Sequence, residues 1–457
     1  MASYNPPSVQ VSSVANNRII NISEDVRIPA IVGQGPTKRT VTDYPIVRSS
    51  SGYDLLVNSG SSAGYITLTK VASYPGAPVS NSSWHLHYGT SGSCAVYWEG
   101  TAGSTMPRTG ETYYVSYHYP VPSSQFTPTV FTDSADIVTA YGSEDSSTPN
   151  ITIAANMALE NGAPAVMCLQ VSGSVSSDAN WTTAFNKLKK KSNVAYVVPV
   201  ASGSTIQTAA LQHCLVESAP VIGHERECIF GATPGTTVDT FVSKAVALKN
   251  SRVILVAPSD NITRISPTGT TLILQGAHIA AALAGLITAQ DKAITPVTGK
   301  IITGFTIPDD QYEPYDMNYM AANGVCVIYS MSGIIKVRHA ITTDPTSADT
   351  REISIVSSDD MVRRITREKL TDAYVGKGIV ISSSTPAAVA GTVAAIWSSL
   401  VREGLIDNYG TKNDPTTGEV PISASQDPNE PTKINVTGAV RFLYPLNYIS
   451  VTFYIYV

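Results

Sequence analysis

Some side chains in this 457-residue sequence are of the types that perform catalysis or bind metals, so their neighbours decide what they can do. His85 and His87 alternate on a predicted strand and could both face a metal ion, but no third ligand lies near them in the sequence. We interpret them as two histidines on the polar face of a strand. The segment His224-Glu225-Arg226-Glu227 offers a base beside carboxylates. It lacks an adjacent nucleophile or oxyanion donor, which favours a solvated turn at the entry to a strand.

Two carboxylate pairs and one glycine-rich turn are the other candidates for chemistry. Asp309-Asp310 falls in a predicted loop, and Asp359-Asp360 opens a predicted helix, where acidic side chains interact favourably with the helix dipole. Residues 33–38 read GQGPTK, but Pro36 and the lack of a following helical pattern favour a turn over a phosphate-binding loop. The sequence therefore predicts no catalytic residue, no cofactor and no metal site, and a protein that is not an enzyme.

The composition indicates a large packed body with a surface that is polar rather than charged. Hydrophobic residues make up 43% of the chain and charged residues 14%, and Tyr (23) far outnumbers Phe (8). Protein–protein interface cores are poor in charge and rich in Tyr, so this suits a chain covered by other subunits, although it also suits an extracellular all-β protein. The net charge of −5 predicts no general attraction to nucleic acid or to anionic membranes.

Cysteine spacing and the N-terminus bear on the compartment. The scattered cysteines, without CxxC spacing, predict buried free thiols from a reducing compartment: Cys94, Cys168, Cys214, Cys228 and Cys326. The first residues, MASYNPPSVQV, have no basic or apolar region typical of a signal peptide. Leu272–Ala289 carries Gln275 and His278, so we expect a buried helix there and no membrane insertion.

The texture of the chain changes along its length and predicts a mixed α/β (α+β), multi-domain protein. Short Tyr-, Val- and Thr-rich runs between Gly, Ser and Pro clusters indicate a β-sandwich or barrel in 37–125. From 126 to 250, helices alternate with apolar strands, which indicates a parallel α/β layer. The predicted divisions are an N-terminal linking arm (1–24), a first core strand (25–36), a β-rich peripheral domain (37–125), an α/β domain (126–250), a C-terminal core domain (251–445) and a C-terminal linking strand (446–457).

The second half of the chain mixes helices and strands. We expect a strand at 252–258, a hairpin at 323–342, and a helix over 386–403 with Thr385 as its N-cap and Gly404 after its end. A polar loop over 408–433 is expected to lead to the last strand.

Two features stand out against this background. Tyr448–Val457 alternates apolar and polar residues without a charge or a proline, so left free it would be an aggregation-prone edge. It is either a closing strand of its own subunit or a strand added to a neighbour, and the weak strand pattern in the N-terminal arm favours the second reading. In a helix expected over Asp359–Lys369, Arg363, Arg364 and Arg367 lie within about 100° of arc. They form a solvated basic face or meet an acidic partner.

The order of certain segments along the chain is informative, although no single one of them is specific. In chain order they are RIPAIVGQGP (27–36), ADIVTAYG (135–142), ANMALENGAPAVMCLQV (155–171), QGAHIAAALAGLITAQD (275–291), ITPVTGKIITGF (294–305), NGVCVIYSMSGIIKVRHAITTD (323–344), REISIVSSDDMVRRITREKL (351–370, a strand and then a helix) and AGTVAAIWSSLVREGLI (390–406). This order resembles that of contractile tail sheath proteins of myovirus-type bacteriophages, and the resemblance covers about 25–36 and 126–457.

The resemblance implies a structural virion protein of the tail, assembled in the host cytoplasm. It would polymerise with itself as stacked, hexameric rings around a tail tube protein and contract to drive the tube through the host envelope. Baseplate and tail terminator proteins would be further partners. It also implies that Arg363, Arg364 and Arg367 face the tube. The strands linking one subunit to the next would contain Val9, Val11, Ile449, Val451, Phe453, Ile455 and Val457.

Two other classes of function remain open from the residues alone. The Ser-, Thr- and Tyr-rich texture of 37–125 suits an extracellular adhesin or surface-layer protein. The α/β pattern of 126–250 would suit a flavodoxin-like enzyme acting on a small molecule, although a phosphate-binding loop is missing.

Overall fold

The structure is a computed structural model, and its description covers the following residues: 27–36, 38–56, 66–74, 77–79, 83–88, 94–99, 106–120, 123–144, 151–173, 175, 177–414 and 418–447. The chain divides into two compact units. The smaller is Gly35–Gln125, and the larger combines the residues up to Gln34 with Phe126–Val457. The mixed α/β class predicted from the sequence is confirmed.

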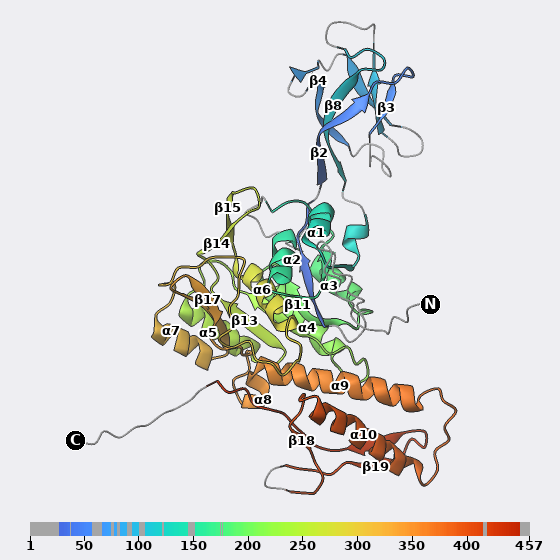
Figure 1. Ribbon diagram of the computed structural model, residues 1–457, viewed down its shortest axis with the longest axis vertical. Helices are drawn as coiled ribbons and strands as arrows, with labels where there is room; N and C mark the ends of the chain where they lie inside the picture. Colours follow the sequence, from blue (N-terminus) through green and yellow to red (C-terminus); the bar gives the residue numbers. More distant parts are fainter. Residues whose placement is uncertain are drawn as a thin grey trace, which may run out of the picture. The chain divides into compact units, whose positions relative to one another are not determined.

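The larger unit is built on a sheet whose strands follow the order β17-β16-β13-β12-β11-β1-β10-β9 (Figure 1). Pairing is parallel from β16 through to β10, whereas β9 and β17 run antiparallel to their neighbours. The strands are β1 (Ile28–Gly33), β9 (Thr129–Phe131), β10 (Val166–Gln170), β11 (Val194–Pro199), β12 (Glu227–Gly231), β13 (Val253–Ala257), β16 (Val325–Met331) and β17 (Ile334–Val337).

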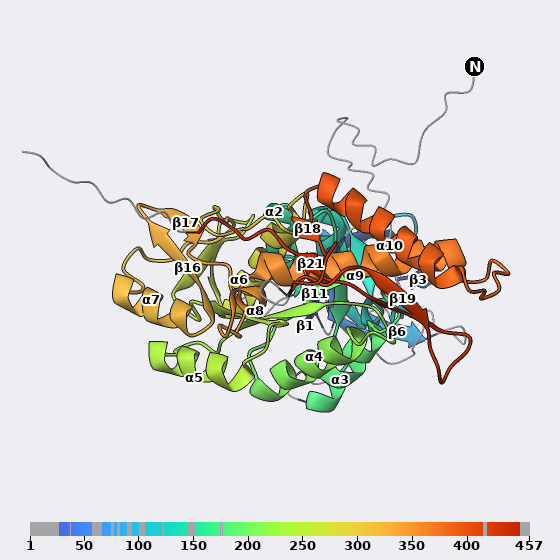
Figure 2. The same cartoon turned by 90° about the horizontal axis from the view of Figure 1, so that it is seen from below.

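Helices cover both faces of this sheet, as the near-continuous apolar strands require. Figure 2 shows α3, α4 and α5 on one side of β1 and β11, and α6 on the other. In β1, Ile31 packs into the core under α2 and α6, while Ala30 and Val32 pack into the core under α3, α4, α5 and α7. The helices are α1 (Ser134–Tyr141), α2 (Ile151–Glu160), α3 (Asp178–Lys187), α4 (Ser204–Glu217), α5 (Val238–Leu248), α6 (Gly276–Thr288) and α7 (Pro314–Ala322).

The stretch predicted as one helix over Leu272–Ala289 begins instead as a strand. Thr271–Leu274 is β15, which pairs with β14 (Ile262–Ile265), and α6 starts only at Gly276. Leu272 and Leu274 are buried while Ile273 is exposed, which is the two-residue period of a strand. α6 lies very close to α2, because a Cβ at Gly285 would lie 2.1 Å from the Ala158 carbonyl oxygen of α2. No helix in the described part of the chain has both the length and the apolar character needed to cross a membrane.

Apart from the start of one 3₁₀ turn, the regular elements among the described residues of the smaller unit are β-strands, and two sheets share its core. β2-β8-β4-β5 form one sheet and β3-β7-β6 the other. Buried Asp54 accepts hydrogen bonds from Trp98 Nε1 (3.1 Å) and the Tyr113 hydroxyl (2.9 Å), and so joins the two sheets inside the core. The strands are β2 (Lys38–Val47), β3 (Tyr53–Leu55), β4 (Thr67–Tyr74), β5 (Ala77–Pro78), β6 (Trp84–Tyr88), β7 (Cys94–Trp98) and β8 (Thr112–Pro120), and the 3₁₀ turn η1 (Ser123–Phe126) follows.

The last part of the larger unit is built on a long helix that the sequence placed only in part. The expected strand before Asp359 is wrong: α9 runs from Ile353 to Tyr374, after the short α8 (Ala348–Arg351). The helix also continues past Lys369. α10 (Thr385–Arg402) packs on α9, and Ser384 rather than Thr385 is its N-cap. The predicted polar loop contains further strands, in two-stranded sheets: β18 (Asn408–Tyr409) with β21 (Val440–Arg441), and β19 (Ser423–Gln426) with β20 (Ile434–Thr437).

Candidate assembly surfaces

The two halves of α9 have different surroundings. Its buried side chains all precede Arg363 and include Ile353, Val356, Ser357 and Asp360. Val362 at the end of the first half and Ile365 in the second half belong to a small core with residues of and after α10. α9 therefore docks on the sheet with its first half and supports the C-terminal elements with the rest (Figure 1).

A buried polar seam joins the first half of α9 to the amino ends of the strands. Arg252, just before β13, donates two hydrogen bonds of 2.8 Å to the Asp360 carboxylate. The Ser357 hydroxyl donates to Glu227 Oε1 (2.9 Å) at the start of β12 and lies 2.5 Å from the Tyr196 hydroxyl of β11. Paired in this way, the seam holds α9 in one position, since a buried polar group without its partner is costly.

Glu227 is the unusual member of the seam. It is fully buried, and its Oε2 has no hydrogen-bond partner among the described residues. Burial, and then the nearby Asp360, raises the pKa of Glu227 to about 8. At neutral pH its carboxyl group is therefore mostly protonated, while Asp360 pairs with Arg252.

The segment predicted as a solvated turn is instead mostly buried. Glu225, Arg226 and Glu227 are all at most 1% exposed. Arg226 donates to the carbonyl oxygens of Leu188 (3.2 Å) and Lys191 (2.8 Å), and so fastens the end of α3 to the loop after α4. The error arose because four consecutive polar residues are typical of a surface turn, whereas here each of the buried three meets a partner from a distant segment.

Two of the predicted tube-facing arginines contact their own subunit. Arg367 hydrogen-bonds to the carboxylate of Glu225 and donates to the Gly223 carbonyl (2.7 Å), while Arg364 donates to the carbonyls of Val194 and Glu225. Burial is the largest single effect on Glu225 and raises its pKa. The hydrogen bond from Arg367, a backbone hydrogen bond and the charges of Arg367 and Arg364 together outweigh burial, so the pKa of this carboxyl is lowered.

Arg363 has a different environment. Its guanidinium lies 2.6 Å from Asp359, one helical turn earlier, and the arginine side chain is 47% exposed. The three arginines are therefore not equivalent. Arg364 and Arg367 hold α9 against the loop before β12, whereas Arg363 is exposed. The sequence could show that they share a face of a helix, but not which part of that face the subunit itself covers.

The predicted linking strands lie outside the described residues: Val9, Val11, Ile449, Val451, Phe453, Ile455 and Val457. The points where they join the described chain are visible. Arg27 donates to the Tyr196 hydroxyl (2.8 Å), at the seam. Asn447 donates to Glu352 Oε2 (3.2 Å), and Tyr444 donates to Asp349 (2.7 Å). Both ends of the described chain are thus fastened to the larger unit.

The remaining candidates for chemistry have structural partners. His85 pairs with Glu99 (3.2 Å) on the outer face of β6, and His87 contacts the ring of Tyr53. Asp309 accepts hydrogen bonds from Ser330 and from the Gly333 amide. Within the described ranges, no three His, Cys, Asp or Glu side chains are grouped so as to hold a metal ion.

Comparison with known proteins confirms the resemblance found in the sequence. No protein-family model matches the chain. The tail sheath protein of Mycobacterium phage Bxz1 is 29% identical over 355 residues, which are 75% of this chain and 58% of that protein. The tail sheath protein of Bacillus phage SP01 is 26% identical over 278 residues, 60% of this chain and 45% of that protein. The matches thus span about half the length of these curated relatives.

Solved structures show the same fold. A subunit of the anti-feeding prophage helical sheath in its contracted state aligns over 99% of both chains, with a TM-score of 0.58 and 11% identity. The contracted sheath complex of an extracellular contractile injection system, PVC, aligns over 72% of this chain and 86% of its own, with a TM-score of 0.54 and 12% identity. A sheath tail protein from Listeria innocua aligns over 91% and 92%, with a TM-score of 0.50 and 12% identity.

Proposed function

We propose that this relative of phage tail sheath proteins is itself the sheath subunit of a contractile tail. It polymerises as stacked rings around a tail tube, and contraction of the polymer drives the tube through the host envelope. Its place is the virion tail, after assembly in the host cytoplasm. Its partners are further copies of itself in hexameric rings, the tube protein, the baseplate and the tail terminator. The role is structural rather than enzymatic.

One observation carries the proposal. Sequence likeness to a phage tail sheath protein extends over three quarters of the chain, and likeness to the fold of a helical sheath subunit extends over nearly all of it. One comparison is of sequence and names a tail sheath protein, and the other is of structure and names a helical sheath in its contracted state. Fold likeness alone would leave the function open.

Two small sheets are suitable acceptors for the linking strands. β18–β21 and β19–β20 each contain only two strands among the described residues, and such small sheets are marginally stable alone. β19 and β20 pack on α10. A strand donated by a neighbouring subunit would extend either sheet, and each main-chain hydrogen bond it forms would contribute about 0.5–1.5 kcal/mol.

The seam suits a subunit that moves as a body. Contraction of a lattice requires subunits to rotate without unfolding while the links between them hold. Polar contacts between α9 and β11, β12 and the segment before β13 make the C-terminal elements part of the same body as the sheet.

For the tube contact, the geometry favours Arg363 over its two companions. Arg364 and Arg367 already contact Glu225 and nearby carbonyl groups, so groups of the same subunit partly neutralise their charge and occupy their donors. Arg363, with its half-exposed guanidinium, can meet an acidic tube surface. A single exposed contact of this kind is worth about 0–1 kcal/mol, which is weak enough to break ring by ring.

Electron microscopy of the purified, concentrated protein tests the function directly. We expect negatively stained tubes or stacked rings, formed without any other protein and pelleting on ultracentrifugation. Dispersed particles across the whole concentration range, from a protein that melts cooperatively, would refute the sheath assignment.

A further inference from the structure

A group of apolar side chains projects into solvent at the C-terminal end of α4. Val221 is 91% exposed, and beside it lie Val216 (48%), Ile222 (40%) and Leu215 (37%). Single exposed apolar residues are common, but several from one helix end and its loop mark a contact surface. We call these four residues the α4 patch.

The loop that carries Val221 is held firmly. Arg226, five residues after Val221, donates to the Leu188 and Lys191 carbonyls and so ties this loop to the end of α3. Arg367 of α9 donates to the Gly223 carbonyl, and Gly223 has a φ of +77° with the guanidinium directly over it. A loop restrained on two sides presents its apolar residues at little entropic cost on binding.

Positive charge borders the α4 patch on the α3 side. Lys187, Lys189, Lys190 and Lys191 follow one another at the end of α3, and no acidic residue occurs from 179 to 216. Lys190 and Ile222 line the same groove of about 580 Å³. Glu368 and Asp372 lie on the α9 side of this groove, so the basic border is confined to α3.

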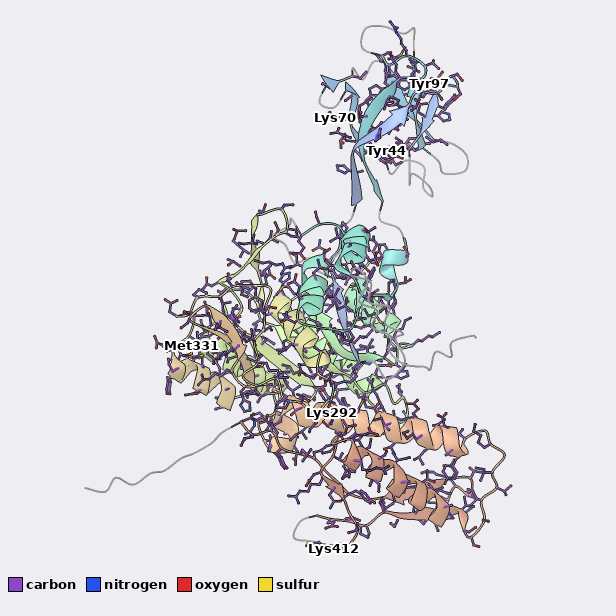
Figure 3. The ribbon with its side chains drawn as sticks, in the orientation of Figure 1. Tyr44, Lys70, Tyr97, Lys292, Met331 and Lys412 are labelled. Carbon is purple, nitrogen blue, oxygen red and sulfur yellow. The ribbon has the colours of Figure 1, made fainter. Side chains whose placement is uncertain are left out.

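A second patch, around α7, has the opposite charge. Tyr315 (77%), Met331 (64%), Ile334 and Tyr319 are exposed, and the Tyr315 and Tyr319 rings stack with centroids 6.5 Å apart. Asp310 and Glu313 are exposed in the turn before α7. Asp309 connects this turn to the β16–β17 hairpin by accepting from the Gly333 amide. We call these residues the α7 patch; Met331 marks it in Figure 3.

The topology of the larger unit keeps the two patches apart. α3 and α4 connect parallel strands, so their C-terminal ends lie at the amino edge of the sheet. α7 leads into β16, which is parallel to β13, so the N-terminal end of α7 lies at the carboxyl edge. Figure 2 shows α7 and α3 at different ends of the helical layer. The patches of one subunit therefore cannot meet each other, whereas those of two copies can.

We propose that the α4 patch of one subunit binds the α7 patch of a second copy in a head-to-tail contact. Aliphatic residues meet the tyrosines and Met331 at the centre, and Lys189 and Lys190 meet Asp310 and Glu313 at the rim. Such a contact between different patches repeats from copy to copy and closes into a ring or continues as a helix. It rests on the proposed function, because it joins copies of one lattice, but it is a contact between folded bodies and is separate from any donated strand.

Charge reversal tests the pairing in the full-length protein. Lys189→Glu/Lys190→Glu and Asp310→Lys/Glu313→Lys each place like charges at the rim, so each variant should need about tenfold more protein for half-maximal polymerisation. The protein carrying all four substitutions should polymerise near the wild-type concentration, as should an equimolar mixture of the two variants. Lys377→Glu/Lys412→Glu, at exposed lysines elsewhere, is the matched control and should change little. Sedimentation measures polymerisation, and thermal melting shows that each variant is folded.

The outcomes separate this contact from the proposed function. If the wild-type protein polymerises and neither reversal alters the concentration needed, the pairing is wrong while the sheath function stands. If each reversal weakens polymerisation but neither the combination nor the mixture restores it, the two patches do not bind each other. A wild-type protein that never polymerises would overturn both the contact and the function.

Discussion

Glu227 shows how a single buried residue can tie stability to pH. It sits under α9, accepts a hydrogen bond from Ser357, and burial raises its pKa from 4.5 to about 8. In the unfolded chain it ionises at its ordinary pKa, so between about pH 4.5 and 8 the folded state binds more protons than the unfolded state. The contribution of Glu227 to the free energy of unfolding must therefore fall as the pH rises through this window.

Glu227→Gln should remove this dependence. Gln keeps an acceptor for Ser357 but never ionises, so the variant should gain stability over the wild type as the pH rises from 4.5 to 8. The difference between the two should grow by up to about 1.4 kcal/mol per pH unit. Urea unfolding of the unpolymerised protein at several pH values measures it.

Glu225→Gln is the control with the opposite sign. The pKa of Glu225 is lowered through Arg367, so its contribution is present above the unfolded pKa and lost as the pH falls. The free energy of unfolding of this variant should be lower than that of the wild type at neutral pH and equal to it at acidic pH. For Glu227 itself, the contrary result would be a free energy of unfolding that changes with pH in the same way in the wild type and in Glu227→Gln. That result would show that Glu227 ionises at its ordinary pKa in the folded protein.

Arg363 is the residue with which to test the tube contact. Arg363→Gln should leave the melting temperature nearly unchanged, since the i,i+4 pair with Asp359 is worth at most about 0.5 kcal/mol. It should weaken assembly templated by the tube, as added salt does, because exposed contacts are screened over about 8 Å at physiological ionic strength. Arg108→Gln, at an exposed arginine of the smaller unit, serves as the matched control. Unchanged co-assembly of the Arg363 variant with tubes at low salt would exclude the contact.

At the scale of elements, sequence pattern located most strands of the main sheet but not β9, and it located α2, α3, α4 and α6 but not α1, α5 or α7. The apolar runs that became β10 to β13 are unambiguous, and helices fit between them. The sequence pattern misplaced the start of α9, because Ile353 and Ile355 alternate with polar residues as in a strand. The contacts that hold this part of the helix could not be predicted either, because the partners of Ser357 and Asp360 come from distant strands. The seam was not predictable for the same reason: nothing near Ser357 in sequence indicates that Tyr196 and Glu227 lie beside it.

Removal of the predicted C-terminal linking strand should separate folding from assembly. A chain ending at Asn447 keeps the contacts of Asn447 and Tyr444 with Glu352 and Asp349. We expect it to retain a cooperative melt and to lose tube formation, as measured by calorimetry and electron microscopy.

The opposite results would be equally clear. If the last strand belonged to the core of its own subunit, its loss would remove several apolar side chains worth about 1.5–3 kcal/mol each and would unfold the C-terminal elements. A truncated chain that fails to fold, or one that still builds tubes, would contradict the linking role.

At the scale of the whole molecule, the smaller unit is an insertion between β1 and β9 with a core of its own. We predict that replacing Gly35–Gln125 with a short flexible linker leaves polymerisation intact and gives tubes of smaller outer diameter. The larger unit loses none of its described core, since the clusters on its two sheet faces contain no residue of the insertion. Electron microscopy measures the tubes, and an unfolded far-UV spectrum would show that the insertion supports the core.

The buried cysteines bear on what happens to such a polymer once it leaves a cell. All five cysteines are buried and none forms a disulfide bond, as the sequence predicted. Burial raises the pKa of Cys94 to about 11 and that of Cys326 to about 12, and oxidants attack the thiolate form. A particle assembled in a reducing cytoplasm, as proposed above, and then released into aerated medium would carry thiols that oxygen and peroxide oxidise slowly. Its subunits would then form few accidental disulfides during long storage, so that the polymer would keep its proposed ability to contract until it meets a host.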